Sequence, residues 1–225
     1  MRNVDSRIIT DAQTGIHENL SKVIKKHLST QYRKPISGHT QKAFDKISRR
    51  VDESIEGGAP LILDSCCGTA VSTRIIALDN PNALVIGIDR SAVRLEKEYN
   101  NELPENAILV QAECADFWSL AENAGWKLHK HTILYPNPYP KTKHLKRRWH
   151  GHPAFPLLLS LGGELELRSN WKVYTEEFCE ALNIATPSGM NCSSVETFQT
   201  DAPLTLFEKK YQNSGQELYR VKISL

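Results

Sequence analysis

Apolar positions in the first quarter of the chain follow the spacing of amphipathic helices. The first stripe predicts a helix over residues 12–28, and it consists of Ile16, Leu20, Val23, Ile24 and Leu28. Pro35 and Gly38 interrupt this pattern. A second stripe of Phe44, Ile47, Val51 and Ile55 predicts another helix, which ends at Gly57 and Gly58. We therefore expect residues 1–56 to form a helical N-terminal extension.

From residue 57 onward, short apolar runs alternate with segments of helical spacing. The expected strands are 61–63, 83–89, 108–110, 132–135 and 164–169, and the expected helices are 71–78, 91–100, 117–124 (with Asp116 as its cap) and 173–184. Continuous apolar strands separated by helices predict a parallel sheet covered on both faces, and the right-handed crossover rule makes it doubly wound. The segments 194–200 and 218–225 resemble a closing strand pair. The second alternates apolar and polar residues, so it is expected to be antiparallel. Residues 57–225 thus predict one α/β domain.

Composition narrows the class of protein. No apolar run is long enough to span a bilayer and the first residues are polar, so we expect a cytoplasmic protein without membrane contact. The five cysteines form no Cys-x-x-Cys pair, so neither a zinc knuckle nor a redox dithiol is expected. Their odd number and scattered positions indicate reduced thiols. The histidines of residues 144–152 lie beside Lys and Arg, so no metal site is expected there.

The net charge is only +2, but basic residues are concentrated in two places. One run occupies residues 141–148, and another extends from Lys22 to Lys34. Such blocks indicate contact with a polyanion. The alternative for the run at 141–148 is an ordinary solvated loop.

Acidic and small residues follow three successive expected strands. The first strand is followed by Asp64 and the small-residue turn 65–70, the second ends at Asp89, and the third ends before Glu113. Ligands of open α/β sheets bind beyond these carboxyl ends. Asp89 can accept hydrogen bonds from ribose hydroxyls, and Glu113 can accept one from an adenine amino group. The absence of Gly-x-Gly-x-x-Gly disfavours a dinucleotide.

The stretch after the fourth expected strand carries a family signature. Its residues 135–148 read Tyr-Pro-Asn-Pro-Tyr-Pro-Lys-Thr-Lys-His-Leu-Lys-Arg-Arg. This closely resembles the signature of the bacterial tRNA (guanine-N7)-methyltransferase family. The resemblance covers roughly residues 60–225. It continues in Gly87–Asp89, 106–114, Gly162–Gly163, 169–174 and Thr205–Glu208.

The resemblance implies a class I methyltransferase fold, S-adenosylmethionine as the methyl donor, and tRNA or another RNA as the acceptor. The implied cofactor-binding residues are Asp64, Cys66, Gly68, Asp89, Arg90, Glu113, Cys114 and Asn137. The implied catalytic residues are Asn137, Asn170 and Glu208. The implied substrate-binding residues are Lys141, His144, Lys146, Arg147, Arg148, Asn170, Thr205 and Glu208.

Four positions depart from the family pattern. Cys66 and Ala70 stand where the family loop has glycine, and Asn137 and Asn170 stand where its pocket has aspartate. The two amides indicate a changed acceptor or lost catalysis. A non-catalytic RNA-binding relative and a methyltransferase acting on a small molecule are therefore the alternative hypotheses. The target nucleotide stays open.

Overall fold

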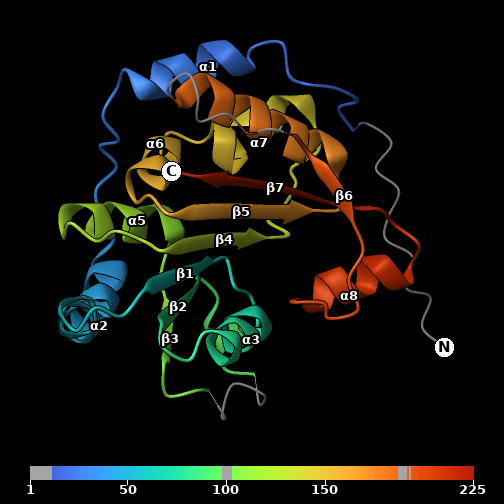
Figure 1. The fold of residues 1–225 in the computed structure, drawn as a ribbon. Coiled ribbons are helices and arrows are strands. Elements are labelled where there is room, and N and C mark those ends of the chain that lie inside the picture. The colour runs from blue at the N-terminus through green and yellow to red at the C-terminus, as the bar shows by residue number, and fades with distance from the viewer. Residues whose placement is uncertain (1–11, 98–102, 187–191, 193) are drawn as a thin grey trace. The chain divides into compact units, whose positions relative to one another are not determined.

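The computed structural model describes residues 12–97, 103–186, 192 and 194–225. Seven strands follow the order β3-β2-β1-β4-β5-β7-β6 (Figure 1). Their bounds are β1 Leu61–Ser65, β2 Leu84–Asp89, β3 Ala107–Gln111, β4 Lys130–Leu134, β5 Glu164–Ser169, β6 Glu196–Phe198 and β7 Leu218–Ser224. The described chain divides into two compact units. The first unit contains residues 12–32, 135–155 and 167–223, and the second contains residues 33–134, 156–166 and 224–225, in each case as far as they are described.

The second unit is built on the parallel strands β1 to β4. β1 pairs with β2 and β4, and β2 pairs with β3. Every residue of β1 and β2 is buried, which explains their uninterrupted apolar runs. The helices of this unit are α2 Gly38–Glu56, α3 Val71–Asp79, α4 Ala92–Leu95 and α5 Cys114–Asn123, with most of α6 Phe155–Ser160. The predicted parallel sheet is confirmed in these strands.

Helix α2 is fastened to the second unit by aromatic packing. The Phe44 ring stacks on Trp126 at a centroid distance of 4.6 Å and meets Phe117 edge-on at 5.2 Å. The Trp126 indole Nε1 donates to Asp52 Oδ1 at 2.9 Å. Helix α1, Leu20–Leu28, belongs instead to the first unit. A domain boundary at residue 56 stays a prediction.

The first unit holds the helices α1, α7 (Lys172–Ala185) and α8 (Leu206–Asn213) and the 3-10 helices η2 (Thr142–Arg147) and η3 (Trp149–Gly151). Helix α1 buries Leu20, Ile24 and His27 and packs beside α7 (Figure 1). Strands β6 and β7 pair antiparallel, with Phe198 opposite Leu218. This pairing confirms the predicted antiparallel closing strand.

Two expected helices are shorter than the sequence pattern suggests. The helix expected over 12–28 begins only at Leu20, because Gln13 and the backbone N–H of His17 bond to the Glu177 carboxylate instead. The helix expected over 91–100 spans Ala92–Leu95, and residues 98–102 lie outside the described residues. Helices α6 and α8 were not predicted.

The predicted cap of the third helix is wrong. Helix α5 begins at Cys114 with Glu113 at the N-cap position, so Asp116 lies inside its first turn. The Asp116 carboxylate is fully buried and accepts hydrogen bonds from Lys34 Nζ and Ser37 N, both at 3.0 Å. It therefore fastens the segment that precedes α2 rather than capping a helix.

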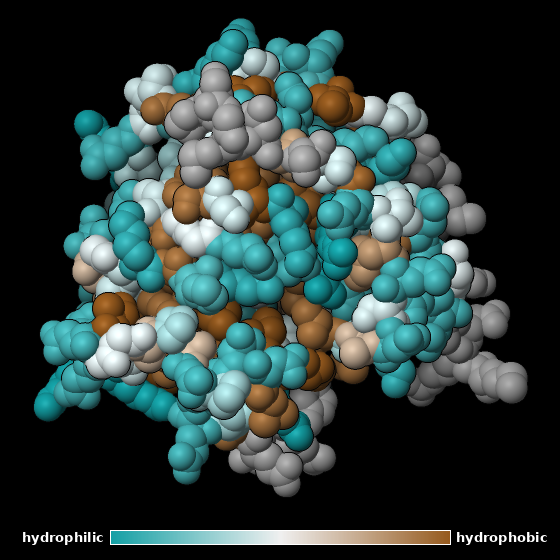
Figure 2. Space-filling model, viewed as in Figure 1, coloured by the Kyte–Doolittle hydropathy of each residue, from teal (hydrophilic) through white to brown (hydrophobic). Residues whose placement is uncertain are grey.

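The cysteine prediction is wrong for one pair. Cys179 on α7 forms a disulfide with Cys192, while Cys66, Cys67 and Cys114 are free thiols. Asn183 Oδ1 accepts from Cys192 N at 2.8 Å, and this bond holds the Cys192 backbone against α7. No described helix is long and apolar enough to cross a membrane. Hydrophobic residues form only small groups among hydrophilic ones on the face in Figure 2.

Candidate active site

The loop after β1 and the acid at the end of β2 meet in the second unit. Asp89 Oδ2 accepts from Gly68 N at 3.0 Å, and its Oδ1 accepts from Ser91 N at 2.8 Å. Cys67 N donates to Ile88 O at 2.9 Å. The parallel register places the ends of β1 and β2 side by side, which explains why residues this far apart in sequence converge. This part of the predicted cofactor site is brought together.

The β1 loop keeps a backbone that glycine adopts most easily. Cys66, Gly68 and Ala70 have φ values of 62°, 60° and 57°. A non-glycine residue in this region costs on the order of 1 kcal/mol. Cys66 and Ala70 therefore preserve the turn expected of the family glycines, at some cost in backbone strain.

Cys66 also connects the loop to the start of α5. Its Sγ lies 3.6 Å from Cys114 Sγ. This hydrogen bond and burial raise the pKa of the Cys114 thiol, which keeps the thiol protonated. Two predicted cofactor residues thus meet at the end of the sheet where Asp89 lies.

Asp64, a predicted cofactor-binding residue, is engaged by hydroxyl groups inside the second unit. Its side chain is fully buried, and its carboxylate accepts from the hydroxyls of Ser72, Thr73 and Thr132 at 2.6, 2.7 and 3.0 Å. Burial raises the pKa of this carboxyl. These hydroxyls belong to α3 and β4, so Asp64 fixes α3 against the sheet, and its contact with a cofactor stays a prediction.

Glu113 and Arg90 are exposed, as a ligand contact requires. Glu113 N donates to Thr40 Oγ1 at 3.2 Å, and no ion pair engages its carboxylate within the described part of the chain. The Arg90 carbonyl accepts from Gln111 Nε2 at 3.3 Å. Both remain predicted cofactor contacts.

A buried polar group that the sequence analysis missed supports the end of β1. Trp118 Nε1 donates to Ser65 Oγ at 3.0 Å, and Ser65 Oγ lies 2.8 Å from His131 Nε2. Burial lowers the pKa of His131 to about 3, so the ring is neutral. The polar residue inside the apolar pattern of β4 was the only sequence signal for it.

The predicted acceptor residues lie in the first unit. Asn137 is exposed, and its Oδ1 accepts from Tyr139 N at 3.3 Å. Asn170 Nδ2 donates to Gln216 Oε1 at 2.8 Å. The backbone around Asn137 is unusual, because Tyr135 and Tyr139 have φ values of 51° and 45°.

Glu208 is buried and fully engaged. Its carboxylate accepts from Tyr135 OH at 3.0 Å, Arg168 Nη1 at 2.9 Å and Leu204 N at 2.6 Å. Thr205 Oγ1 accepts in return from Glu208 N at 2.9 Å. Thr205 therefore caps the N-terminus of α8, while the Glu208 side chain accepts from Leu204, the residue before the cap. Glu208 therefore positions Tyr135 and Arg168, and its direct contact with an acceptor base stays a prediction.

Arg148 is the clearest correction to the predicted substrate contacts. Its side chain is fully buried, and Nη1 donates to Glu177 Oε2 at 2.5 Å. The guanidinium also donates to the carbonyls of Tyr139 and Lys141, and it lies 4.9 Å from the Trp171 ring. With its donors used inside the unit, Arg148 is not available to a phosphate.

Glu177 is the centre of this network. Its carboxylate also accepts from His150 Nε2 at 2.8 Å, Gln13 Nε2 at 2.6 Å and His17 N at 2.9 Å. Burial by itself would raise the pKa of Glu177, but His150 and Arg148 together lower it to about 2. The sequence analysis missed Glu177, because its partners lie far away along the chain. The network fixes residues 139–150, which carry the basic run.

The other predicted basic contacts remain open to solvent. Lys141, Lys146 and Arg147 are exposed, and His144 is half-buried. Arg147 lies over the Tyr139 ring at 5.8 Å. These side chains therefore keep the phosphate-binding role as a prediction.

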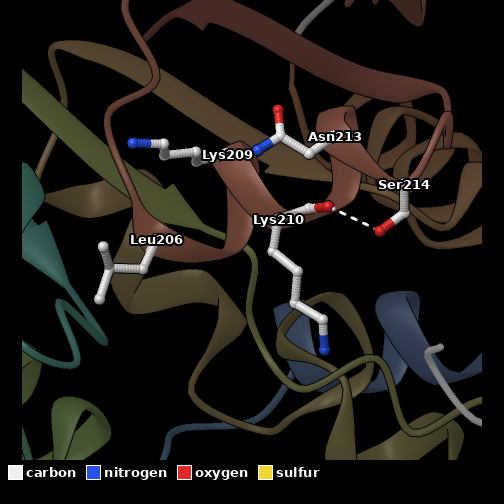
Figure 3. A pocket seen from close by; sticks show the side chains of 5 residues that line it. All are labelled: Leu206, Lys209, Lys210, Asn213 and Ser214. Carbon is white, nitrogen blue, oxygen red and sulfur yellow. Dashed lines mark hydrogen bonds between the residues drawn. The ribbon is translucent and has the colours of Figure 1, made fainter. Parts of the chain in front are cut away.

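A pocket of about 350 Å³ lies on α8, and none of the predicted site residues lines it. It is lined by Leu206, Lys209, Lys210, Asn213 and Ser214. Figure 3 shows the two lysine side chains pointing in different directions. Within the described residues, no group of His, Cys, Asp and Glu could hold a metal ion.

Comparisons with known proteins bear on both units. Residues 58–221 match the sequence profile of a family described as "Putative methyltransferase". A tRNA (guanine-N(7)-)-methyltransferase of Treponema pallidum is 30% identical over 171 residues, which cover 72% of this chain but only 66% of that protein. A protein of the same name from Ectopseudomonas mendocina is 26% identical over 77% of this chain and 76% of its own.

Solved structures support the fold. An antibiotic-related methyltransferase matches with a TM-score of 0.58 and 14% identity, covering 89% of this chain and 98% of its own. The 16S rRNA methyltransferase KamB matches with a TM-score of 0.56 and 15% identity, and the match covers 79% of this chain and 94% of KamB. The chain therefore has the predicted class I methyltransferase fold.

Proposed function

The chain belongs to the "Putative methyltransferase" family, and on this premise we propose that it transfers a methyl group from S-adenosylmethionine to tRNA. The observation that carries the proposal is the junction of the β1 loop and Asp89 at the carboxyl ends of parallel strands. This is where open α/β sheets bind nucleotide-like ligands. The names of the Treponema pallidum and Ectopseudomonas mendocina relatives support the same reaction.

The residues at this junction suit the proposed donor. Asp89 is 5% exposed and would accept from the ribose hydroxyls, and the exposed Glu113 would accept from the adenine amino group. The strained loop of Cys66, Gly68 and Ala70 would let the ligand approach the backbone closely. S-adenosylmethionine supplies a methyl group on a sulfonium. Asp64 would support the site by fixing α3 against the sheet, and the Ser65–His131 pair by fixing the end of β1.

The first unit would bind the acceptor. Lys141, Lys146 and Arg147 would contact RNA phosphates, while Asn137 and Asn170 would face the target base. Guanine N7 carries a lone pair and no proton, so transfer to it needs positioning rather than a general base. Two neutral amides would grip a guanine edge less strongly than two carboxylates, since hydrogen bonds to charged groups are about twice as strong. We therefore propose a changed or weakened choice of acceptor, in a cytoplasmic enzyme.

One observation favours a second candidate, a non-catalytic RNA-binding relative. The Glu208 carboxylate is engaged by Arg168 and Leu204, and the two other implied catalytic residues are the neutral Asn137 and Asn170. Calorimetric titration with S-adenosylmethionine separates the candidates, with Asp89→Asn and the surface variant Asp79→Asn as a matched pair. We expect binding by the natural chain and by Asp79→Asn, and clearly weaker binding by Asp89→Asn. Absence of binding by the natural chain would exclude the proposed methyltransferase activity.

A further inference from the structure

Two basic segments that are far apart in the sequence lie next to each other in the first unit. Helix α1 packs beside η3, and His27 Nε2 lies 3.1 Å from Gly151 O. Burial lowers the pKa of His27, and the charges of Lys26 and Lys146 act in the same direction. Both lysines are therefore close enough to act on one imidazole, although one lies on α1 and the other on η2.

Three of the exposed residues on α1 are lysines. Lys22, Lys25 and Lys26 follow a spacing of three and four residues, so they share one side of the helix. Leu20, Ile24 and His27 form the opposite, buried side. Because the buried side fixes how the helix is rotated, the three lysines are directed to solvent.

No carboxylate of the described residues forms an ion pair with these lysines. Among the described residues, no ion pair joins an acid to Lys22, Lys25, Lys26, Lys143, Lys146 or Arg147. The nearest acid in sequence, Glu18, accepts a hydrogen bond from Asn19. Like charges one turn apart destabilise a helix. A cluster that keeps them without counter-charges suits an anionic partner.

We propose that α1 and η2 form one phosphate-binding surface for the RNA backbone, which we define as Lys22, Lys25, Lys26, Lys143, Lys146 and Arg147. The inference rests on the proposed function for the identity of the polyanion. Arg148 and Glu177 hold the η2 side of the surface, and His27 holds the α1 side. The surface would bind RNA through charge, without reading its sequence.

The test is RNA binding rather than methyl transfer, so it can succeed or fail independently of the proposed activity. Unmodified tRNA is titrated against the full chain carrying Lys22→Ala, Lys25→Ala and Lys26→Ala, at several salt concentrations. Each lost phosphate contact lowers the log–log salt slope by roughly 0.7–0.9, so three lower it by roughly 2–3 and the affinity at 0.15 M salt by roughly 100-fold.

The matched control removes the same charge from α2 in the second unit, with Lys42→Ala, Lys46→Ala and Arg49→Ala. We expect a salt slope close to that of the natural chain from this control. An unchanged salt slope in the α1 variant would overturn the proposal. The lysines of α1 would then bind another polyanion, such as an acidic protein. An equal fall in both variants would also overturn it, since the effect would then follow net charge alone.

Discussion

Replacing Glu177 by glutamine tests whether the buried network holds the segment that carries the basic run. The carboxylate accepts from Arg148, His150, Gln13 and the backbone of His17. Glutamine keeps the shape but removes the charge. Its amide group also places a donor where a carboxylate oxygen now accepts. The Arg148 guanidinium, which is fully buried, would be left without a counter-charge.

Two independent values give the loss in free energy of unfolding that Glu177→Gln should cause. The pKa of Glu177 falls from an ordinary 4.5 to about 2, which corresponds to roughly 3–4 kcal/mol of stability. Breaking a buried ion pair by removing one partner costs about 3–5 kcal/mol. Because the folded pKa is lowered, this stability is present above pH 4.5 and is lost as the pH falls towards 2.

Denaturant unfolding followed by circular dichroism at pH 7 measures the effect. We expect Glu177→Gln to lower the free energy of unfolding by about 3 kcal/mol. The neighbouring Glu176→Gln is the control, because its pair with Lys172, at 3.6 Å, lies on the surface and should contribute less than about 1 kcal/mol. Equal stability of the two variants at pH 7 would refute the role assigned to the network.

Three further results are expected. Asp89→Asn should raise the dissociation constant for S-adenosylmethionine about tenfold by calorimetry, since a charged acceptor is lost; an unchanged constant would remove Asp89 from the site. Asn137→Asp combined with Asn170→Asp should increase 7-methylguanosine in tRNA by mass spectrometry, and no increase would show that the amides do not limit the acceptor. Reducing the Cys179–Cys192 disulfide, which closes a separation of 13 residues, should lower the free energy of unfolding by about 3 kcal/mol. Cys179→Ser should lower it equally, and insensitivity to reductant would contradict the bond's contribution.

The strands were predictable because burial on both faces leaves an uninterrupted apolar run. The pattern of residues 164–169 gave the bounds of β5, and Gly57 marked the end of α2. The start of α1 was not predictable from periodicity. Ile16 fits the helical spacing, yet it is 51% exposed, because Gln13 and His17 bond to a carboxylate on α7. A long-range contact overrides the local pattern there.

In the candidate site, too, some features were predictable from the sequence and others depend on long-range contacts. The junction of Gly68 with Asp89 follows from the parallel pairing of β1 with β2, and the sequence predicts a parallel sheet. The burial of Arg148 does not, because a charge run gives no sign of which member turns inward to Glu177. Asp64 likewise sits in the expected place, but its hydroxyl partners on α3 and β4 decide its role.

Transfer of labelled methyl groups from S-adenosylmethionine to unmodified tRNA tests the central claim most directly. We expect label in the tRNA with the natural chain, and a strong reduction with Asp89→Asn at a donor concentration below the variant's dissociation constant. The claim would be contradicted if the tRNA stayed unlabelled although the protein preparation binds both the donor and the tRNA. The chain would then be an RNA-binding protein without transferase activity.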